Sequence, residues 1–310
     1  AIDATKIDKW ALYEIGKYCD EDVPSGYGYV EPRFTCNAYI QTREEAFKLM
    51  TNLASVFRGM AYWSVGQVSA VADMPREASA LFTNANVIDG TFTYSGSSRS
   101  TRHTVALVSW NDPEDMYRQK VEYVEDEEGV RKYGVIQSEI VAFACTSRGQ
   151  ARRMGKWMLY TERLESEIVS WKTGLEGFGV FPGAIVKVAD NLRSGDRVGG
   201  RILAATANTV TLDAPVTLSE WTTYTISLVG PSGVVSDRTV ASVAGTYSEL
   251  SFYPDLTEIP QDYSMWVLAS ANLNPQTMLI LSVTEADATQ VEVTALHHDP
   301  RKFEMVEYDH

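Results

Sequence analysis

The chain has 310 residues and a mass of 34.4 kDa, which exceeds what one hydrophobic core usually serves and excludes a single small domain. Hydrophobic residues make up 45% of the chain and charged residues 22%, so global disorder is excluded as well. The formal net charge is -14 and the pI is near 4.8. This balance argues against stable binding to nucleic acid or to an anionic membrane, because both need a basic face.

Cysteines are sparse, and the three present are Cys19, Cys36 and Cys145. An odd, small set cannot build a disulfide framework, so we expect folding in a reducing cytosol. The longest apolar stretches fall far short of the ~20 residues that span a bilayer, and no transmembrane helix is predicted. The chain begins at Ala1 without a Met or a signal-like segment, which indicates a processed protein or a fragment of a longer one.

The first predicted element is an amphipathic helix over residues 3–18. Its apolar residues recur at three- and four-residue steps, which places Trp10 and Ile15 on one buried face. Residues 33–40 carry apolar side chains at alternate positions, and this pattern predicts a strand.

The best-marked helix start lies at Thr42, which can cap a helix while Glu45 returns a bond to the N–H of the cap. We expect this second helix to cover residues 42–58 and to end at Gly59, in the left-handed conformation that glycine favours. Two short strands are predicted between residues 61 and 72.

Beyond residue 75 the pattern changes to strands separated by polar turns. Strands are predicted over residues 87–94, 104–110, 120–124, 133–145, 168–171 and 184–189. The acidic run from Glu125 to Glu128 is predicted to form a hairpin turn between two of them. A further helix is predicted over residues 147–163, with Thr146 as its cap.

Residues 191–252 are rich in Thr, Ser, Val and Gly, and their turn signals recur about every 8–12 residues, as in small barrels or sandwiches. Three more strands, over residues 264–269, 278–284 and 290–296, precede a tail predicted to be irregular.

These elements predict an α+β fold in three parts. A small helix-and-sheet unit covers residues 1–75. A strand-rich, barrel-like domain covers residues 76–190 together with 253–310, and a small all-β module, residues 191–252, is inserted into it.

No catalytic, metal or cofactor site is predicted. The pair His297 and His298 sits on a predicted strand, where adjacent side chains point to opposite faces, so surface histidines are the favoured interpretation. The carboxylates Glu162, Glu165 and Glu167 straddle a helix end and are either a solvated terminus, which we favour, or an acid/base pair. Walker, HExxH, GxSxG and CxxC motifs are missing from the sequence.

One basic feature stands out on this acidic chain. Arg148, Arg152 and Lys156 follow one another at four-residue steps along one side of the predicted helix. Such a stripe is a candidate subunit interface for an acidic neighbour, including a second copy of the chain. The alternative is a solvated face that pairs with local carboxylates, and both interpretations stay open.

Several uncommon strings stand out along the chain. They are KWALY at 9–13, YCD at 18–20, EPRFTCNAY at 31–39, WNDP at 110–113, RKYGV at 131–135, AFACTSRGQA at 142–151 and GGRIL at 199–203. Together they resemble the host-specificity protein J family of lambda-like phages. The resemblance is ordered and extends over essentially the whole chain, from about Lys9 to Val306.

This resemblance implies a structural protein of the phage tail tip and no enzyme. It implies a hub segment that forms a homotrimer, helps to build a ring closing the tail tube, and joins other tail-tip proteins and the tube. DNA passes through the ring without stable binding, and other parts of the full-length protein contact the host receptor. Assembly takes place in the cytoplasm of the host bacterium, and the mature location is the virion tail tip.

The resemblance also offers an interpretation of the charge. An acidic wall would let DNA slide, whereas a basic one would bind phosphates, and the basic stripe would then face a neighbouring subunit. The alternative function is a carbohydrate-binding or glycan-cleaving tail protein, suggested by the seven Trp, the 16 Tyr and the many carboxylates.

Overall fold

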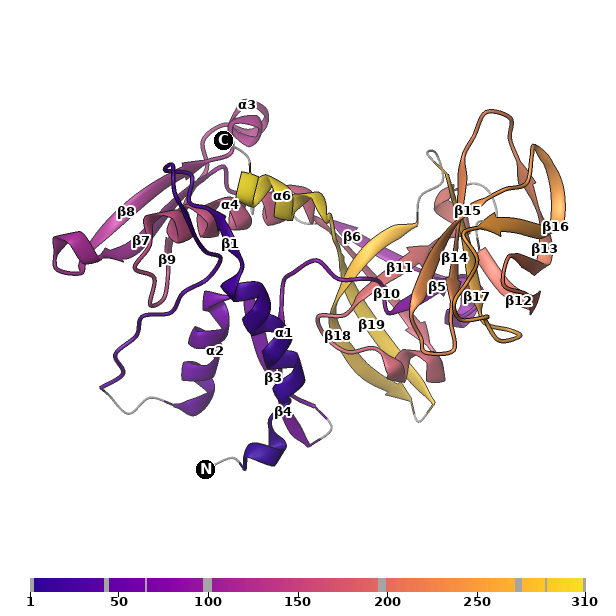
Figure 1. Ribbon diagram of the computed structural model, residues 1–310, viewed down its shortest axis with the longest axis horizontal. Helices are drawn as coiled ribbons and strands as arrows, with labels where there is room; N and C mark the ends of the chain where they lie inside the picture. Colours follow the sequence, from indigo (N-terminus) through magenta and orange to yellow (C-terminus); the bar gives the residue numbers. More distant parts are fainter. Residues whose placement is uncertain are drawn as a thin grey trace. The chain divides into compact units, whose positions relative to one another are not determined.

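The computed structural model describes residues 3–41, 45–64, 66–96, 102–194, 199–270, 275–287 and 289–308. Contact density divides the chain into two units (Figure 1). Unit 1 contains Ala1–Pro75, Ser97–Ser166 and Asp299–His310, and unit 2 contains Arg76–Gly96 and Glu167–His298. The chain therefore passes between the units four times. The division into 1–75, 76–190 with 253–310, and 191–252 that the sequence indicates stays a prediction.

Unit 1 begins with a 3₁₀ turn, Ala4–Lys6, and helix α1, Lys9–Asp20, which packs on the hairpin β3, Gly59–Ser64, and β4, Gln67–Ala72. Asp8 caps α1 by accepting a hydrogen bond from the N–H of Ala11, and Ile15 is buried. The predicted helix is confirmed, but the prediction that Trp10 is buried is wrong, because its side chain is 70% exposed. The reason is that a two-stranded hairpin covers only a narrow side of α1, and Trp10 lies outside it.

The segment predicted as a strand over residues 33–40 is irregular, and that prediction is wrong. Strands β1, Asp22–Pro24, and β2, Val30–Pro32, pair just before it. Beyond them the N–H of Thr35 donates to Oε1 of Gln150 at 3.0 Å, and the N–H of Asn37 donates to the carbonyl of Ala144 at 3.0 Å. These backbone groups therefore bond to another part of unit 1 and not to a neighbouring strand.

Helix α2, Ala46–Val56, confirms the second predicted helix, while its predicted cap Thr42 lies outside the described residues. The predicted stop at Gly59 is wrong, because Arg58 takes the left-handed conformation with φ at 56°. Gly59 instead allows close packing, since an added Cβ would lie 2.5 Å from the carbonyl oxygen of Val71.

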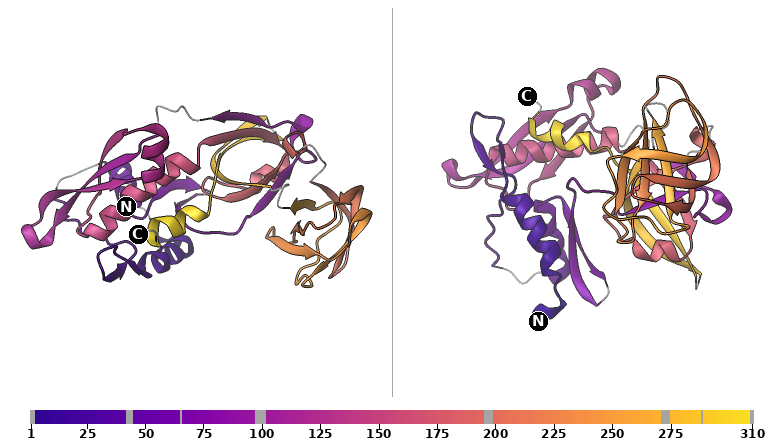
Figure 2. Two further views of the ribbon diagram at one scale, coloured as in Figure 1. Left: turned by 90° about the horizontal axis from the view of Figure 1, so that it is seen from above. Right: turned by 45° about the vertical axis from the view of Figure 1, so that its right-hand side comes forward.

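The centre of unit 1 is a three-stranded sheet with helix α4, Arg148–Leu164, on one face (Figures 1 and 2). Strand β7, Val105–Asp112, lies between β8, Arg118–Glu125, and β9, Gln137–Val141. The predicted hairpin turn after β8 is wrong, because β7 separates β8 from β9. The chain passes from β8 to β9 through helix α3, Glu127–Tyr133, at the end of the sheet where β7 begins.

Helix α4 confirms the predicted helix, although its N-cap is Ser147 and not Thr146. The hydroxyl of Ser147 accepts from the N–H of Gln150. Gly155 lets the helix lie close to the sheet, since an added Cβ would be 2.8 Å from Cγ2 of Val124. The shared core comprises Ala106, Val108, Trp110, Val124, Ala142, Cys145, Ala151 and Leu159.

The tail predicted to be irregular forms helix α6, Arg301–Tyr308, which belongs to unit 1. Its buried residues are Lys302, Phe303, Val306 and Glu307. Two of these four are charged, so the segment shows too few apolar residues at helical spacing for the pattern to be recognised.

Unit 2 contains a six-stranded sheet in the order β5-β11-β18-β19-β10-β6. The strands are β5, Ala80–Thr83; β6, Thr93–Gly96; β10, Glu167–Thr173; β11, Ile185–Ala189; β18, Gln276–Asp287; and β19, Gln290–His297. Only β5 and β11 pair in parallel among these described strands. In the core of this sheet the rings of Phe82 and Trp171 lie 5.0 Å apart.

Unit 2 also contains a closed barrel in the order β12-β13-β16-β15-β14-β17 (Figures 1 and 2). Its strands are β12, Gly199–Ala205; β13, Thr209–Leu218; β14, Tyr224–Val229; β15, Val235–Val240; β16, Gly245–Tyr253; and β17, Met265–Ser270. Trp266, Ile202 and Leu250 fill its centre with other apolar side chains. The short helix α5, Asn191–Ser194, precedes the barrel, and 3₁₀ turns occupy Ile88–Gly90, Pro113–Asp115 and Leu175–Gly179. The predicted α+β class with a barrel is confirmed.

None of the described helices is both long enough and apolar enough to cross a bilayer.

Candidate functional site

The predicted basic stripe lies on α4, but its members differ in exposure. Arg148 is 53% exposed, and its Nε donates to Oε2 of Glu122 at 2.7 Å. Arg152 is half-buried and packs on Gly26, whose φ of 81° requires a residue without a Cβ. Lys156 is only 5% exposed. The structure therefore aligns the three residues on one helix but leaves only Arg148 at the surface.

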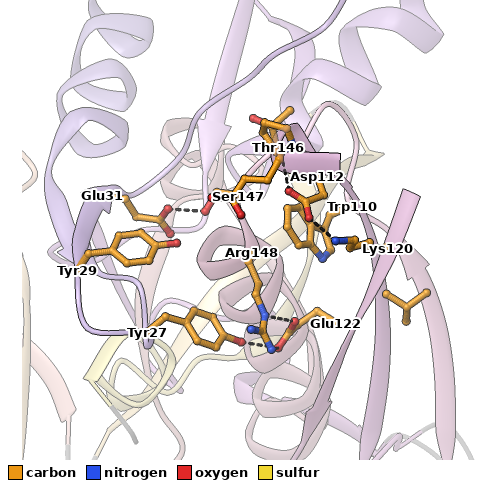
Figure 3. A pocket seen from close by; sticks show the side chains of 13 residues that line it. Tyr27, Tyr29, Glu31, Trp110, Asp112, Lys120, Glu122, Thr146, Ser147 and Arg148 are labelled. Atoms are coloured by element: carbon orange, nitrogen blue, oxygen red, sulfur yellow. Dashed lines mark hydrogen bonds and ion pairs between the residues drawn. The ribbon is translucent and has the colours of Figure 1, made fainter. Parts of the chain in front are cut away.

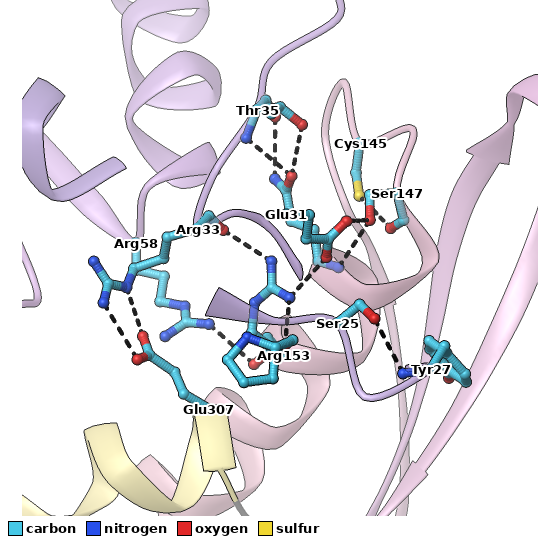
Figure 4. A network of polar contacts seen from close by, with 12 residues as sticks. Ser25, Tyr27, Glu31, Arg33, Thr35, Arg58, Cys145, Ser147, Arg153 and Glu307 are labelled. Carbon is cyan, nitrogen blue, oxygen red and sulfur yellow. Dashed lines mark hydrogen bonds and ion pairs between the residues drawn. The ribbon is translucent and has the colours of Figure 1, made fainter. Parts of the chain in front are cut away.

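Arg153, next to the stripe, is buried in a polar network (Figure 4). Its Nη1 donates to a carboxylate oxygen of Glu31 at 2.7 Å and to the carbonyl of Pro24 at 3.2 Å, and its Nη2 donates to the carbonyl of Arg33 at 3.1 Å. One guanidinium on α4 thereby holds the β1–β2 hairpin and the segment that follows it.

Arg33 extends this network to the C-terminal helix. Its Nε donates to Oε1 of Glu307 on α6 at 2.6 Å, and its Nη1 donates to Oε2 of Glu21 at 2.6 Å. The guanidinium lies 3.8 Å from the centre of the Tyr18 ring. Burial raises the pKa of Tyr18 to about 12, despite the opposing effect of Arg33.

A second buried ionic cluster joins α4 and α6. Nζ of Lys302 lies 2.8 Å from Oε2 of Glu165 and 2.7 Å from Oδ2 of Asp73. The same Asp73 oxygen accepts a hydrogen bond from Nε1 of Trp157 at 2.6 Å. These groups are nearly inaccessible to water, so each carboxylate depends on the protein for its compensation.

The three predicted carboxylates do not gather in one place. Glu162 contacts Nδ1 of His103 at 3.0 Å, and Glu165 belongs to the Lys302 cluster. Glu167 lies in unit 2, where it pairs with Arg193 at 2.8 Å. The prediction of a solvated terminus is wrong for Glu165, which is buried because Lys302 reaches it from a distant part of the chain.

The predicted surface position is also wrong for His298, which is 4% exposed where β19 ends. Its backbone N–H donates to the carbonyl of Thr277 at 2.8 Å, and this places the residue inside unit 2. Within the described ranges, no three His, Cys, Asp or Glu side chains lie close enough to hold a metal ion together.

A cavity of about 720 Å³ opens in unit 1 beside the start of α4 (Figure 3). It is lined by Tyr27, Tyr29, Glu31, Trp110, Asp112, Pro113, Glu114, Lys120, Val121, Glu122, Thr146, Ser147 and Arg148. These residues come from the β1–β2 hairpin, from β7 and β8, and from the start of α4. Of the predicted stripe, only Arg148 lines it.

Polar contacts already connect the walls of this cavity. The hydroxyl of Tyr27 donates to Glu122, the acceptor that Arg148 also uses. The guanidinium of Arg148 lies 4.2 Å from the centre of the Tyr27 ring. Burial and the hydrogen bond to Glu122 raise the pKa of Tyr27 to about 12, so the phenol is a neutral donor at physiological pH. Sequence reasoning missed this site, because its aromatic and acidic residues come from three separate segments.

Comparison with known proteins identifies the family. The model of a family described as "Putative phage tail protein" matches residues 45–205. Two curated relatives carry the name "Tip attachment protein J". The protein of Escherichia phage SECphi27 is 34% identical over 98% of this chain and 26% of its own length. The protein of Escherichia phage SECphi4 is 34% identical over 82% of this chain and 22% of its own length.

The chain thus spans about a quarter of the length of the curated relatives that it matches. Among solved structures, a chain from the virion of a native gene transfer agent particle aligns with a TM-score of 0.42 and 10% identity. The alignment covers 79% of this chain and 36% of that one. The resemblance to the protein J family that the sequence indicates is confirmed, and the chain belongs to the family of putative phage tail proteins.

Proposed function

We propose that this chain is a structural hub segment of a phage tail tip. It forms part of a homotrimeric ring that closes the tail tube, joins other tail-tip proteins and lets DNA pass during infection. The observation that carries the proposal is the 34% identity to a tip attachment protein over 98% of the chain. Receptor contact is assigned to other parts of the full-length protein, because the match covers only 26% of that relative.

The buried ion pairs of unit 1 support a mechanical role. The buried charges of unit 1 bond to one another across distant segments, as Arg33 does with Glu307 and Lys302 does with Glu165. Such pairs fix the positions of helices and strands, and a part that transmits load between neighbours needs this rigidity. Assembly in the host cytoplasm fits the free thiols of Cys19, Cys36 and Cys145.

The subunit interface is proposed on the exposed side of α4. Arg148 is exposed there, Arg152 is half-buried, and Lys156 is a buried member of the same stripe. On a chain with a net charge of -14, they would contact an acidic surface of the neighbouring copy. The acidic surplus would partly face the DNA passage and repel the phosphates.

Charge reversal in the parent phage tests this interface. We expect Arg148→Glu together with Arg152→Glu to reduce the number of assembled tails and the fraction of trimer, measured by electron microscopy and by light scattering of the purified protein. Lys172→Glu is the matched control, since it reverses an exposed charge on unit 2.

A charge swap separates the interface from local pairing. Glu122→Arg combined with Arg148→Glu restores a local ion pair with reversed polarity. If Arg148 contacts a neighbour, the swap leaves assembly impaired. Assembly restored by the swap, or unchanged trimer formation in the double reversal, refutes the proposed interface.

A further inference from the structure

Apart from Arg148, the residues that line the cavity beside the start of α4 have no part in the proposed tail-hub role, and the chemistry of its walls points to a ligand. Its volume of about 720 Å³ lies within the range of about 300–1,000 Å³ that is typical of small-molecule sites. Figure 3 shows Tyr27, Tyr29 and Glu31 on one side and Trp110, Asp112 and Lys120 on the other.

Five of the six charged side chains that line the cavity are already paired, and among the contacts of the described residues Glu114 is the exception. Lys120 lies 2.5 Å from Asp112, and Arg148 lies 2.7 Å from Glu122. Glu31 accepts from Ser147 and lies 2.7 Å from the guanidinium of Arg153 behind the wall. An ionic ligand placed among these five groups would have to displace an existing ion pair, whereas a neutral polar ligand would not.

One wall carries a donor that lacks an acceptor. Trp110 is 7% exposed, and among the described residues no atom accepts a hydrogen bond from its Nε1. Figure 3 draws the indole beside Lys120, whose side chain is 47% exposed and can move toward solvent. Because buried N–H groups are nearly always bonded, this wall is suited to a ligand oxygen.

The opposite wall offers ring faces and acceptors. The ring of Tyr27 is held by its bond to Glu122 and by the guanidinium of Arg148, and Tyr29 is 50% exposed. The faces of the tyrosine rings can pack against apolar C–H groups, while the tyrosine hydroxyls and the carboxylate of Glu31 can form hydrogen bonds with ligand hydroxyls. The ligand must therefore accept a hydrogen bond from Trp110 on one wall and donate hydrogen bonds to the acceptors of the opposite wall.

A sugar meets both requirements, because each hydroxyl is a donor and an acceptor. A cationic side chain only donates, so it leaves Trp110 unbonded. An anion only accepts, and it would face Glu31, Asp112 and Glu122. We propose that this cavity binds a neutral oligosaccharide, with a hydroxyl accepting from Nε1 of Trp110 and a sugar face packed on Tyr27 and Tyr29. This inference does not rest on the tail-hub role.

Binding to the purified chain tests the proposal. The probes are maltotriose and chitotriose as neutral sugars, 3′-sialyllactose as an anionic sugar, and N-acetylarginine amide as a cationic side-chain mimic. Affinities are measured by calorimetry and by saturation-transfer NMR. We expect at least one neutral sugar to bind with a Kd below about 10 mM, more tightly than either charged probe.

Two variants and a control locate the ligand. Trp110→Phe removes the indole N–H and should weaken binding about tenfold, as expected for one hydrogen bond. Tyr29→Ala changes an exposed side chain, so it tests the same site even if the Trp110 variant folds poorly. Trp221→Phe is the control, since Trp221 is fully exposed on unit 2 and should not alter binding.

Three results overturn the proposal. One is that neither neutral sugar binds up to about 10 mM. Another is that the arginine amide binds and the sugars do not, which would assign the cavity to a protein side chain. The third is equal loss of affinity in the Trp110 and Trp221 variants, which would place the sugar elsewhere. Tail assembly is not measured in these experiments, so their failure would leave the proposed function untouched.

Discussion

Replacing Lys302 with Met should destabilise unit 1 strongly. The side chain of Lys302 is 1% exposed, and its Nζ lies within 2.8 Å of Glu165 and 2.7 Å of Asp73, whose side chains are 1% and 10% exposed. Methionine nearly preserves the volume but removes the ammonium group that pairs with Glu165 and Asp73. Removing one partner of a buried ion pair costs about 3–5 kcal/mol, because the remaining charge stays buried and uncompensated. That is a large share of a total stability of about 5–15 kcal/mol.

Urea unfolding followed by circular dichroism measures this loss. Arg301→Met is the matched control, because Arg301 is 79% exposed while it pairs with Asp299, and such pairs contribute only about 0–1 kcal/mol. Adding Glu165→Gln and Asp73→Asn to Lys302→Met removes the stranded charges and should recover part of the loss. If Lys302→Met costs no more than Arg301→Met, or if the added changes recover nothing, the reasoning about buried charge is wrong.

Three further predictions concern packing, alkaline stability and thiol reactivity. Gly155→Ala should lower the free energy of unfolding in urea by about 1–3 kcal/mol, because the new Cβ would lie 2.8 Å from a methyl group of Val124. Gly16→Ala is the control, because the new Cβ meets open space on α1 and should stabilise the protein by about 0.5–1 kcal/mol. Equal effects of the two changes would contradict this account of α4 packing. Tyr18 has its pKa raised from 10.0 to about 12, so the folded state keeps a proton that the unfolded state loses, and stability should fall as pH rises from about 10 to 12. Tyr18→Phe should flatten that decline by up to about 2–3 kcal/mol, and an unchanged slope would count against the burial of the phenol. Iodoacetamide at pH 8 should label the exposed Cys36 well before Cys145, because Cys145 is buried and burial raises its pKa to about 11. Peptide mass spectrometry measures the labelling of each thiol, and simultaneous labelling would contradict the packing of Cys145.

Local periodicity was sufficient to predict the long elements. A helix is predicted over residues 147–163, and α4 occupies Arg148–Leu164. The prediction is accurate because apolar residues at helical spacing indicate which face of the helix packs against the sheet. The hairpin of β3 and β4 was predictable on the same grounds, since alternating apolar residues indicate burial on one side. For residues 191–252 the turn signals indicated a small barrel or sandwich but not its individual strands.

Long-range ion pairs were beyond the reach of that reasoning. Arg33 and Glu307 are 274 positions apart, and Lys302 and Glu165 are 137 positions apart. A charged residue has no local signature of burial, because its partner lies in another segment. For this reason the sequence predicts Lys156 at the surface, Glu165 in solvent, and residues 301–308 without a regular structure.

The candidate cavity was unpredictable for a related reason. Trp110 was assigned to a strand, but its unbonded N–H depends on which side chains of other segments surround it. Tyr27 and Tyr29 lie beside Gly26 and Gly28, where no periodic pattern predicts their surroundings. The ring of Tyr27 contacts Arg148 and Glu122, which come from other segments of the chain.

The repeated passage of the chain between its two units constrains the order in which the ribosome can produce a finished fold. Unit 1 combines strands from the first half of the chain with α6, residues 301–308. Glu307, which pairs with Arg33, and Lys302, which pairs with Glu165, are therefore synthesised more than 130 residues after these partners. During that delay the barrel can close from contiguous residues 199–270, while unit 1 lacks α6 and the six-stranded sheet of unit 2 lacks β18 and β19. Nascent chains stalled before residue 302 should accordingly hold a folded barrel and a protease-sensitive amino-terminal half.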